Sequence, residues 1–474
     1  ARVDAFYLDG FAPARNPAMW EHGVFVMLAR VAAPGATAAT WSDAHAVRES
    51  LRGAGFEVHA AARQGGISDS TLARFSPRFA PPVPPGRVVP RDAPAHAIVI
   101  GGGLAGASTA RALAHQGIAC TVIDRHAEPA AEASGNPASL FHGAVIRHDG
   151  PHARLLRAAA LRCAPAMRAA IARGVPGCGD GLLRLESRLS LAAMQDLLDR
   201  QALPASYVQA FSAALATQTA GLALAHAAWF YPGGGWMDPS ALVRDALTTP
   251  GVTWRGATTA QRIARHGDAW QLFDVDDRVI AEAPVLVLAN ASDALRLAGL
   301  PMAWLQRQRG QLSWSAHAAT SAPRIPIASG GYVLTLPSGA LLFGATKQEH
   351  DEDPTVRDSD HGANRGKASL LLGADALREI GAMHGRTAWR ATAPDRLPLV
   401  GPAPDLTAPR PLRADAARLL PRQPGLWLHS GLGSRGLTTA TLCAELIAAQ
   451  VSGAPWPLDA DLVDAIDPAR GVLR

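Results

Sequence analysis

The feature that most constrains the fold of this chain is a short apolar run that leads directly into a glycine-rich turn. The run covers residues 96–100, and three glycines follow it: Gly101, Gly103 and Gly106. In such a strand–turn–helix unit the first glycine permits the tight turn and the second lets the backbone approach a pyrophosphate. The third lets the helix pack closely on the strand. The pattern predicts a Rossmann-type α/β domain that binds a dinucleotide at a helix N-terminus.

The next apolar strand makes this prediction more specific. Residues Cys120–Ile123 end in Asp124, a position from which a carboxylate can accept a hydrogen bond from an adenosine ribose. Strand, glycines, helix, strand and acid in this order are more specific than the glycines alone. FAD and NAD share the arrangement, so other segments must decide between them.

Three further segments favour FAD. Ala133–Asn136 follows shortly after the acid, Pro284–Asn290 is an apolar strand that ends in small residues, and residues 426–436 form a second strand, glycine turn and helix start. The N-terminus of that last helix can face the pyrimidine edge of a flavin, where reduced flavin is negatively charged. We therefore predict FAD as the cofactor. The candidate FAD-binding residues are Gly101, Gly103, Gly106, Asp124, Ser134, Asn136, Gly433, Ser434, Arg435 and Gly436.

A proline-rich segment divides the chain. Residues 81–95 cannot join a helix or a sheet and favour a semi-rigid linker. The 80 residues before it alternate short strands and helices, as in an α/β sheet. The predicted elements are a strand at Asp4–Leu8, a helix at Ala18–Ala33, a strand at Thr37–Trp41, a helix at Ala44–Gly53 and a strand at Phe56–Val58. We predict one domain at 1–80 and a second at 96–474.

Composition limits the partners and the compartment. The net charge is +5, and 43 of the 45 basic residues are arginine, because Lys347 and Lys367 are the only lysines. Arginine suits phosphate binding, although an arginine-rich genome explains the bias at least as well. The four cysteines are scattered without metal-ligand spacing, which predicts no metal site and buried thiols in a reducing cytoplasm. No signal peptide or membrane span is visible, and the start inside an apolar strand suggests an N-terminal truncation.

The second domain resembles the D-amino-acid oxidase and glycine oxidase superfamily of amine-oxidising flavoproteins, most clearly at Trp389–Gly401. In glycine-oxidase-like enzymes an arginine five residues before an aspartate binds the substrate carboxylate, and Arg390 precedes Asp395 by five residues. The alternative for Arg390 is a structural ion pair. The resemblance implies an antiparallel-sheet substrate domain inserted into the FAD-binding domain. The implied FAD-binding segments are about 96–165, 235–295 and 385–455, and the substrate segments are about 166–234 and 296–384.

A closer resemblance is to the bifunctional tRNA-modifying family MnmC. It is carried by Ala133–Asn136, Phe230–Trp236, Arg309–Gln311, Asp395–Pro398 and Gly433–Leu437 in the oxidoreductase half, and by Leu8–Pro17 with Trp20 in the methyltransferase half. The resemblance implies FAD-dependent removal of the carboxymethyl group from carboxymethylaminomethyl-(2-thio)uridine at the tRNA wobble position. The products are aminomethyl-uridine and glyoxylate. Methylation by S-adenosylmethionine then follows in a full-length protein. Asp9, at the end of a strand, either orients the amine or only caps the strand-to-loop turn.

The same resemblance implies tRNA as the partner, with no membrane and no obligate protein partner. The methyltransferase half of this sequence lacks its first part, including the glycine-rich loop for S-adenosylmethionine, so we expect this chain not to methylate. Ser139, His142–Gly143 and Lys347 depart from the family pattern. The alternative functions are a small-molecule glycine, sarcosine or D-amino-acid oxidase, and a flavin-bearing tRNA scaffold without turnover.

Several side chains keep two interpretations. Arg435 either stabilises the flavin or pairs with an acid. Tyr231 and Trp236 either line the substrate pocket or pack in the core, and core packing is favoured for Trp236. His429 is predicted to be a core histidine. Candidate tRNA-binding surfaces are Arg410, Arg413, Arg418 and Arg422, or a helix with Arg154, Arg157, Arg162 and Arg168. Charge runs of this kind are usually solvated faces.

Overall fold

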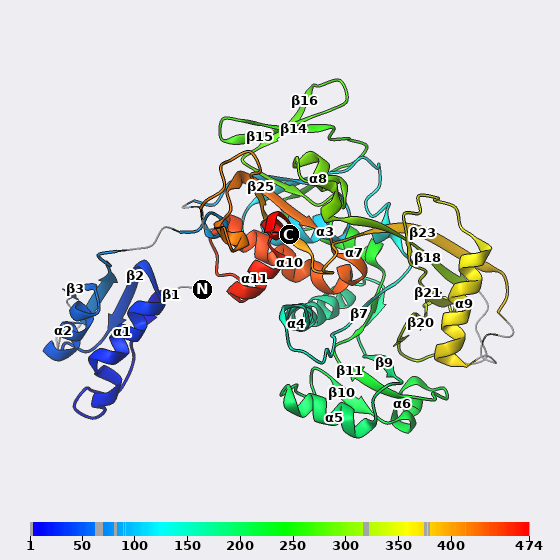
Figure 1. Ribbon diagram of the computed structural model, residues 1–474, viewed down its shortest axis with the longest axis horizontal. Helices are drawn as coiled ribbons and strands as arrows, with labels where there is room; N and C mark the ends of the chain where they lie inside the picture. The colour runs from blue at the N-terminus through cyan, green and yellow to red at the C-terminus, as the bar shows by residue number, and fades with distance from the viewer. Residues whose placement is uncertain are drawn as a thin grey trace. The chain divides into compact units, whose positions relative to one another are not determined.

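The computed structural model describes residues 3–61, 70–79, 83–88, 90, 92–315, 322–373, 377, 380–412 and 414–473. The chain forms two compact units, Ala1–Val83 and Pro84–Arg474 (Figure 1). The boundary between them falls inside the proline-rich segment. Each unit has its own hydrophobic core, and each is described here by itself.

The first unit is a four-stranded sheet with two helices. The strand order is β1 (Val3–Tyr7), β2 (Ala32–Thr40), β4 (Ser70–Phe75) and β3 (Phe56–Ala61). The helices are α1 (His22–Val31) and α2 (His45–Gly53). β1 and β2 are parallel, and β4 pairs antiparallel with both of its neighbours. The core is built around Phe25, Val47, Leu51 and Phe56.

One prediction for this unit needs correction, and one strand was missed. The helix expected over Ala18–Ala33 is a short 3-10 turn at Pro17–Trp20 followed by α1, which ends at Val31. The residue before Pro34 is biased toward extended backbone, so the chain turns into β2 from Ala32 onward. β4 was not predicted, because only alternate residues of this short strand are buried and its apolar pattern is weak.

The second unit contains a six-stranded sheet with the order β13, β6, β5, β17, β25, β24. The bounds are β13 (Val252–Arg255), β6 (Ala119–Ile123), β5 (His96–Ile100), β17 (Val285–Leu288), β25 (Arg422–Ser430) and β24 (Leu399–Pro404). All neighbouring pairs are parallel except β24 with β25. β5 and β17 are buried on both faces, as expected for parallel strands covered by helices.

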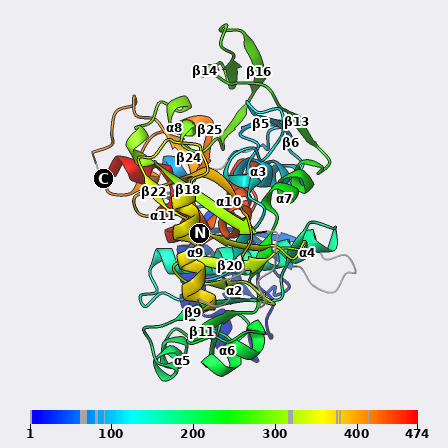
Figure 2. The ribbon, with the colours of Figure 1, turned by 90° about the vertical axis from the view of Figure 1, so that its right-hand side faces the viewer.

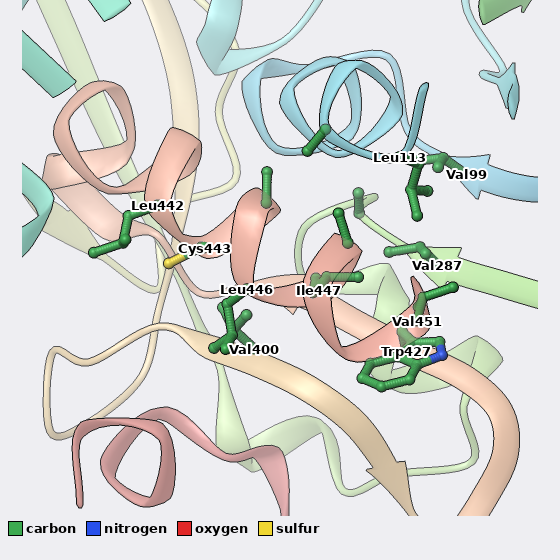
Figure 3. Close-up of a cluster of buried hydrophobic side chains, with 14 of the residues drawn as sticks. Val99, Leu113, Val287, Val400, Trp427, Leu442, Cys443, Leu446, Ile447 and Val451 are labelled. Carbon is green, nitrogen blue, oxygen red and sulfur yellow. The ribbon is translucent and has the colours of Figure 1, made fainter. Parts of the chain in front are cut away.

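Helices α3 (Leu104–His115) and α10 (Gly436–Ser452) cover one face of this sheet and pack on each other. Figure 3 shows their shared core, in which Val99 and Val287 from the sheet meet Leu113 of α3 and Ile447 of α10. At about 25 cal/mol for each Å² of apolar surface removed from water, each such side chain contributes roughly 1.5–3 kcal/mol. This core holds the two helix N-termini at one edge of the sheet.

A second, mostly antiparallel sheet lies beside the first within the same unit. Its order is β10, β11, β9, β19, β20, β21, β18, β22, with β23 also paired to β18. The bounds are β9 (Leu182–Glu186), β10 (Gln209–Phe211), β11 (Ala227–Tyr231), β18 (Gln306–Ser315), β19 (Ile327–Ala328), β20 (Tyr332–Thr335), β21 (Leu341–Gly344), β22 (Gln348–Glu349) and β23 (Met383–Thr392). Helix α9 (Asp358–Leu372) covers one face of β18, β20 and β21, on the side away from α3 and α10 (Figures 1 and 2).

The remaining elements of the second unit complete its periphery. The helices are α4 (Pro151–Ala172), α5 (Leu191–Arg200), α6 (Ala213–Ala220), α7 (Pro239–Leu247), α8 (Asp293–Leu297) and α11 (Ala460–Ile466). Two three-stranded sheets contain β7 (Ser139–Phe141), β12 (Gly235–Met237) and β8 (Gly177–Cys178), and β14 (Arg262–His266), β15 (Ala269–Phe273) and β16 (Val279–Ala283). The predicted Rossmann-type α/β domain with an antiparallel sheet, preceded by a separate α/β segment, is confirmed. None of the helices in the described part of the chain is long and apolar enough to span a bilayer.

Candidate functional site

The glycine turn after β5 leaves no room for side chains. Gly101 has φ of +112°, and a Cβ there would lie 2.6 Å from the Ala289 carbonyl oxygen. At Gly106 a Cβ would lie only 1.8 Å from the Gly101 oxygen, so α3 packs against the turn at a distance that only glycine permits. Gly103 is the N-cap of α3. The N-terminus of α3 therefore lies at a turn without side chains, where a pyrophosphate can approach the backbone N–H groups closely.

Asp124 and Ser134 flank this turn. One Asp124 carboxylate oxygen accepts a hydrogen bond from the Gly102 amide at 2.6 Å, and the other accepts one from the His126 amide at 2.8 Å. Ser134 Oγ accepts a hydrogen bond from the Leu104 amide at 2.9 Å, in the first turn of α3. Both side chains remain half-buried at the edge of the turn. The turn, the helix N-terminus and the acid fit the adenine-dinucleotide half of FAD.

The carboxyl ends of three parallel strands meet at this edge. The Ala289 amide donates to the Ile100 oxygen at 2.8 Å, and Ser430 Oγ donates to the Ala291 oxygen at 2.8 Å, which joins the ends of β5, β17 and β25. Open α/β sheets bind ligands beyond this edge. The amide oxygen of Asn290 is buried there without a hydrogen-bond partner in the described part of the chain, and it is available to a ligand. Asn136 is half-buried directly after the 3-10 turn Ala133–Gly135.

The second glycine turn connects the two sheets. Gly433 has φ of +55°, residues Gly433–Arg435 form a 3-10 turn, and α10 begins at Gly436. Thr392, the last residue of β23, pairs with Leu432 in an antiparallel bridge. The helix start predicted to face a flavin therefore lies beside the strand that carries Arg390. Ser434 is exposed in this turn.

Arg435 contacts a histidine. Its Nη1 donates to His142 Nε2 at 2.8 Å, and His142 Nδ1 lies 2.6 Å from the Gly143 oxygen. Both contacts are satisfied by the neutral tautomer with the proton on Nδ1. Burial, followed by the charges of Arg435 and Arg184, holds the pKa of His142 well below its usual range. Among the described residues no carboxylate pairs with Arg435, so the acid-pair interpretation finds no support.

Arg390 is half-buried on β23 and lies against Gly310 of β18. A Cβ at Gly310 would come within 2.4 Å of the Arg390 guanidinium, so a side chain at this position would displace the guanidinium from where it lies. Burial lowers the pKa of Arg390, and the nearby Tyr332 opposes this effect. Burial also raises the pKa of the Tyr332 hydroxyl to about 12. In the described part of the chain Arg390 makes no ion pair, which argues against the structural alternative for this residue.

Two contributions to this site were not visible in the sequence. Tyr332 is one tyrosine in a glycine-containing segment, and only the pairing of β20 with β21 and of β21 with β18 brings it near Arg390. Arg309 was noted only as part of a motif, yet its side chain is fully buried. It pairs with Asp360 at 2.6 Å and donates to the oxygens of Asp353 and Thr355. Arg309 therefore fixes the segment around 353–360 beside Gly310.

The remaining predictions have mixed outcomes. Tyr231 and Trp236 are both buried, and the Tyr231 hydroxyl accepts a hydrogen bond from the Val145 amide at 3.1 Å, so neither ring is open to solvent. His429 is fully buried, and its Nδ1 lies 2.7 Å from Thr109 Oγ1. It is a core histidine, as predicted, although its Nε2 has no partner among the described residues. The carboxylate of Asp395 binds Arg470 through both oxygens, which gives this family motif a structural role.

The thiols follow the sequence prediction closely. Cys120, Cys163 and Cys443 are buried, and burial raises the pKa of each to about 12. Cys178 is half-buried, with a pKa raised by the same cause. Among the described residues no cluster of histidine, cysteine, aspartate or glutamate is arranged to hold a metal ion.

The arginine surfaces proposed for tRNA are largely neutralised. On α4, Arg154 pairs with Asp459 and Asp461, Arg157 with Asp149 and Arg162 with Glu445. In the other group, Arg418 pairs with Asp464 and Arg422 with Asp467, while Arg413 lies outside the described residues. Asp459, Asp461 and Glu445 lie about 280 to 310 residues from their arginines, and Asp464 and Asp467 about 45, so the sequence could not reveal these pairs. Arg168 and Arg410 remain exposed.

Comparison with known protein families and solved structures shows the class of enzyme to which this fold and site belong. The family described as FAD dependent oxidoreductase matches residues 96–450. The solved glycine oxidase from Geobacillus kaustophilus superposes with a TM-score of 0.62 at 20% identity, over 78% of this chain and 97% of that one. The iminodiacetate oxidase from Chelativorans sp. BNC1 gives a TM-score of 0.62 at 21% identity, over 78% and 98%. The protein is an FAD-dependent oxidoreductase of this fold.

Relatives found by sequence similarity identify the family more narrowly. The tRNA 5-methylaminomethyl-2-thiouridine biosynthesis bifunctional protein MnmC of Methylibium petroleiphilum is 49% identical over 99% of this chain and 75% of that protein. Its counterpart in Burkholderia multivorans is 40% identical over 100% of this chain and 74% of that protein. Residues 1–75 also match the family of S-adenosyl-L-methionine-dependent methyltransferases. The chain belongs to the MnmC family.

Proposed function

We propose that this chain is a tRNA-modifying oxidoreductase that removes the carboxymethyl group from carboxymethylaminomethyl-(2-thio)uridine at the wobble position. The observation that carries the proposal is Arg390, a half-buried guanidinium without an ion-pair partner in the described structure. It lies on the strand that meets the Gly433 turn. A buried cation without a counter-ion is costly, and a substrate carboxylate offsets that cost through a bidentate pair.

The reaction balances as an oxidation followed by a hydrolysis. The side chain R–NH–CH2–COO⁻ loses a hydride from the methylene carbon and a proton from nitrogen, which gives R–N=CH–COO⁻. Water then adds to the imine carbon and the C–N bond breaks, which releases R–NH2 and glyoxylate. Bound FAD supplies the two-electron acceptor. Arg390 supplies orientation by holding the carboxylate, so that the methylene carbon is presented in one position.

The other assignments follow as parts of this proposal. Gly101, Gly103, Gly106, Asp124, Ser134 and Asn136 bind the adenine-dinucleotide half of FAD, and Gly433, Ser434, Arg435 and Gly436 bind its flavin end. The predicted division into FAD-binding and substrate segments applies to residues 96–474. Residues 1–80 belong to a methyltransferase domain that uses S-adenosylmethionine, with Asp9 orienting the amine. Asp9 is exposed two residues after the end of β1.

Anaerobic flavin absorbance tests the proposal. The purified protein is mixed with tRNA carrying the carboxymethylaminomethyl group, with the same tRNA lacking it, and with free glycine or sarcosine. We expect only the first to bleach the flavin and to release glyoxylate in equal amount. Bleaching by the small amines alone would instead establish a small-molecule amine oxidase.

The Arg390→Gln variant tests the role of the guanidinium. Removing a charged bidentate partner costs about 1.5–3 kcal/mol, so kcat/KM for the modified tRNA is expected to fall by roughly 10- to 100-fold while bound flavin stays constant. Arg307→Gln is the matched control, because Arg307 is an exposed arginine on neighbouring β18 that pairs with Glu352. Equal activity of the two variants would remove Arg390 from the site.

A further inference from the structure

Arg184, like Arg390 and Arg435, is a half-buried arginine without a carboxylate partner among the described residues. It lies on β9, where the neighbouring Leu183 and Leu185 point into the core beneath α9. Side chains alternate along a strand, so Arg184 lies on the opposite face. The face that carries Arg184 is the one turned away from α9.

The strand register places Arg184 on the same face as the proposed substrate site. Arg184 of β9 pairs with Ala328 of β19, and Ala328 pairs with Tyr332 of β20. Tyr332 in turn pairs with Gly344 of β21. Directly paired residues share a face, so this row crosses the sheet from β9 to β21. Gly344 pairs with Leu312, and Leu312 with Arg386, which lies four residues before Arg390 on β23. An even separation along a strand keeps the same face, so Arg184, Tyr332 and Arg390 share it.

Arg184 and Arg435 together place two positive charges near the start of α10. Burial lowers the pKa of Arg435 and that of His142, and the charge of Arg184 lowers both further. Burial raises the pKa of the Tyr231 hydroxyl, and the charge of Arg184 opposes this effect. These groups come from β9, from β11, from the segment after β7 and from the Gly433 turn. Like charges repel most strongly where water is scarce. A cluster of this kind is stabilised when an anion enters it.

The spacing of the two arginines excludes a small ligand for both. Five strand steps separate β9 from β23, each about 4.8 Å wide in a regular sheet. A glycine or sarcosine molecule has one carboxylate and is too short to reach from one guanidinium to the other. A substrate that engages both arginines must carry a second anionic group at a distance from its carboxylate. A nucleotide with a carboxylate-bearing arm on its base meets this condition.

We infer that Arg184 binds a backbone phosphate of the tRNA next to the modified uridine, while Arg390 binds the carboxylate at the end of the uridine side chain. The inference rests on the proposed function and adds a determinant that selects the polynucleotide over small amines. Arginine binds phosphate bidentately, which fixes position as well as charge. Arg184 is thus a positioning residue for the nucleotide.

The test compares two substrates and three variants. The substrates are the modified tRNA and the free nucleoside 5-carboxymethylaminomethyluridine, which has the carboxylate and lacks phosphate. The variants are Arg184→Gln, Arg184→Lys and the matched control Arg188→Gln, which removes an exposed arginine just beyond the end of β9. KM and kcat are measured from 50 to 200 mM KCl, and flavin content is checked for each protein.

For the tRNA, Arg184→Gln is expected to raise KM about tenfold with kcat unchanged, and to reduce the slope of log KM against log salt by roughly one. Arg184→Lys keeps the charge and is expected to retain the salt slope. Turnover of the nucleoside is expected to be equal in wild type and all variants. A tRNA KM and salt slope unchanged in Arg184→Gln, or an equal loss on the nucleoside, would overturn the inference. Failure of the wild type to oxidise either substrate would instead overturn the proposed function.

Discussion

At the scale of single residues, the second unit distinguishes arginines that stabilise the fold from arginines that are available to a ligand. Arg309 is fully buried, and its guanidinium is engaged by Asp360, Gln348 and two backbone oxygens. Arg390 and Arg184 are half-buried and have no such partners in the described structure. All three residues are arginine, so residue type alone does not distinguish them. Only the long-range contacts separate the structural residue from the candidate binding residues.

His429 makes a prediction at the same scale. It is fully buried, and burial lowers its pKa to about 3, so it is neutral at physiological pH. In the unfolded chain a histidine titrates near 6.5, so the unfolded state binds the extra proton between pH 6.5 and 3. Stability from this residue is therefore complete above about pH 6.5 and is lost at about 1.4 kcal/mol per pH unit as the pH falls toward 3.

The His429→Asn variant isolates this contribution. The asparagine amide can still donate to Thr109 Oγ1, which His429 Nδ1 contacts at 2.7 Å, and it does not titrate. We expect the denaturation midpoint of the wild type to fall more between pH 8 and pH 5.5 than that of the variant. The buried His142 titrates in both proteins and cancels in the comparison. Parallel pH profiles for the two proteins would show that His429 is not neutral in the folded state.

At the scale of elements, local patterns predicted the strand–turn–helix units well. β5, α3, β6, β25 and α10 each combine an apolar run with a glycine turn or helical periodicity, and all are found where the sequence places them. The nine-stranded sheet was predicted only through family resemblance. Its pairs, such as β18 with β23, join segments some 80 residues apart, and short strands such as β19 have no alternation to detect. For the same reason Tyr332 and Arg184 could not be connected with Arg390 from sequence.

The α3 N-terminus gives the prediction at this scale. A Cβ at Gly106 would lie 1.8 Å from the Gly101 oxygen, so Gly106→Ala forces α3 away from β5. Overpacking of this kind costs about 1–3 kcal/mol, and the displaced helix no longer presents its N–H groups to a pyrophosphate. We expect the purified variant to lose most of its flavin, measured as the ratio of absorbance at 450 and 280 nm.

The matched control is Gly366→Ala, a substitution within α9 where a Cβ would meet nothing within 4 Å. Alanine in a helix interior is more favourable than glycine by roughly 0.5–1 kcal/mol, so this variant should be as stable as the wild type or more so. It is expected to keep its full flavin content. Retention of flavin by Gly106→Ala would show that the glycine turn does not form the pyrophosphate site.

At the scale of the whole molecule, the chain consists of two units with separate cores. Every residue proposed to bind FAD lies in the unit from Pro84 onward, and Asp9 lies in the other. A ligand stabilises only the unit that binds it, because linkage acts on the folding equilibrium of that unit alone. The two units should therefore respond differently to the cofactor.

Differential scanning calorimetry of the flavin-free and FAD-loaded protein tests this expectation. Enthalpy scales at about 0.7 kcal/mol per residue, so the first unit should give a small transition of about 60 kcal/mol and the second a larger one of about 270 kcal/mol. FAD at 100 times its Kd adds about 2.7 kcal/mol to the second unit, which raises the temperature of the larger transition alone. A single transition that moves as a whole with FAD would mean that the two units unfold together. In that case the proline-rich segment would transmit stability between the units and would not simply separate them.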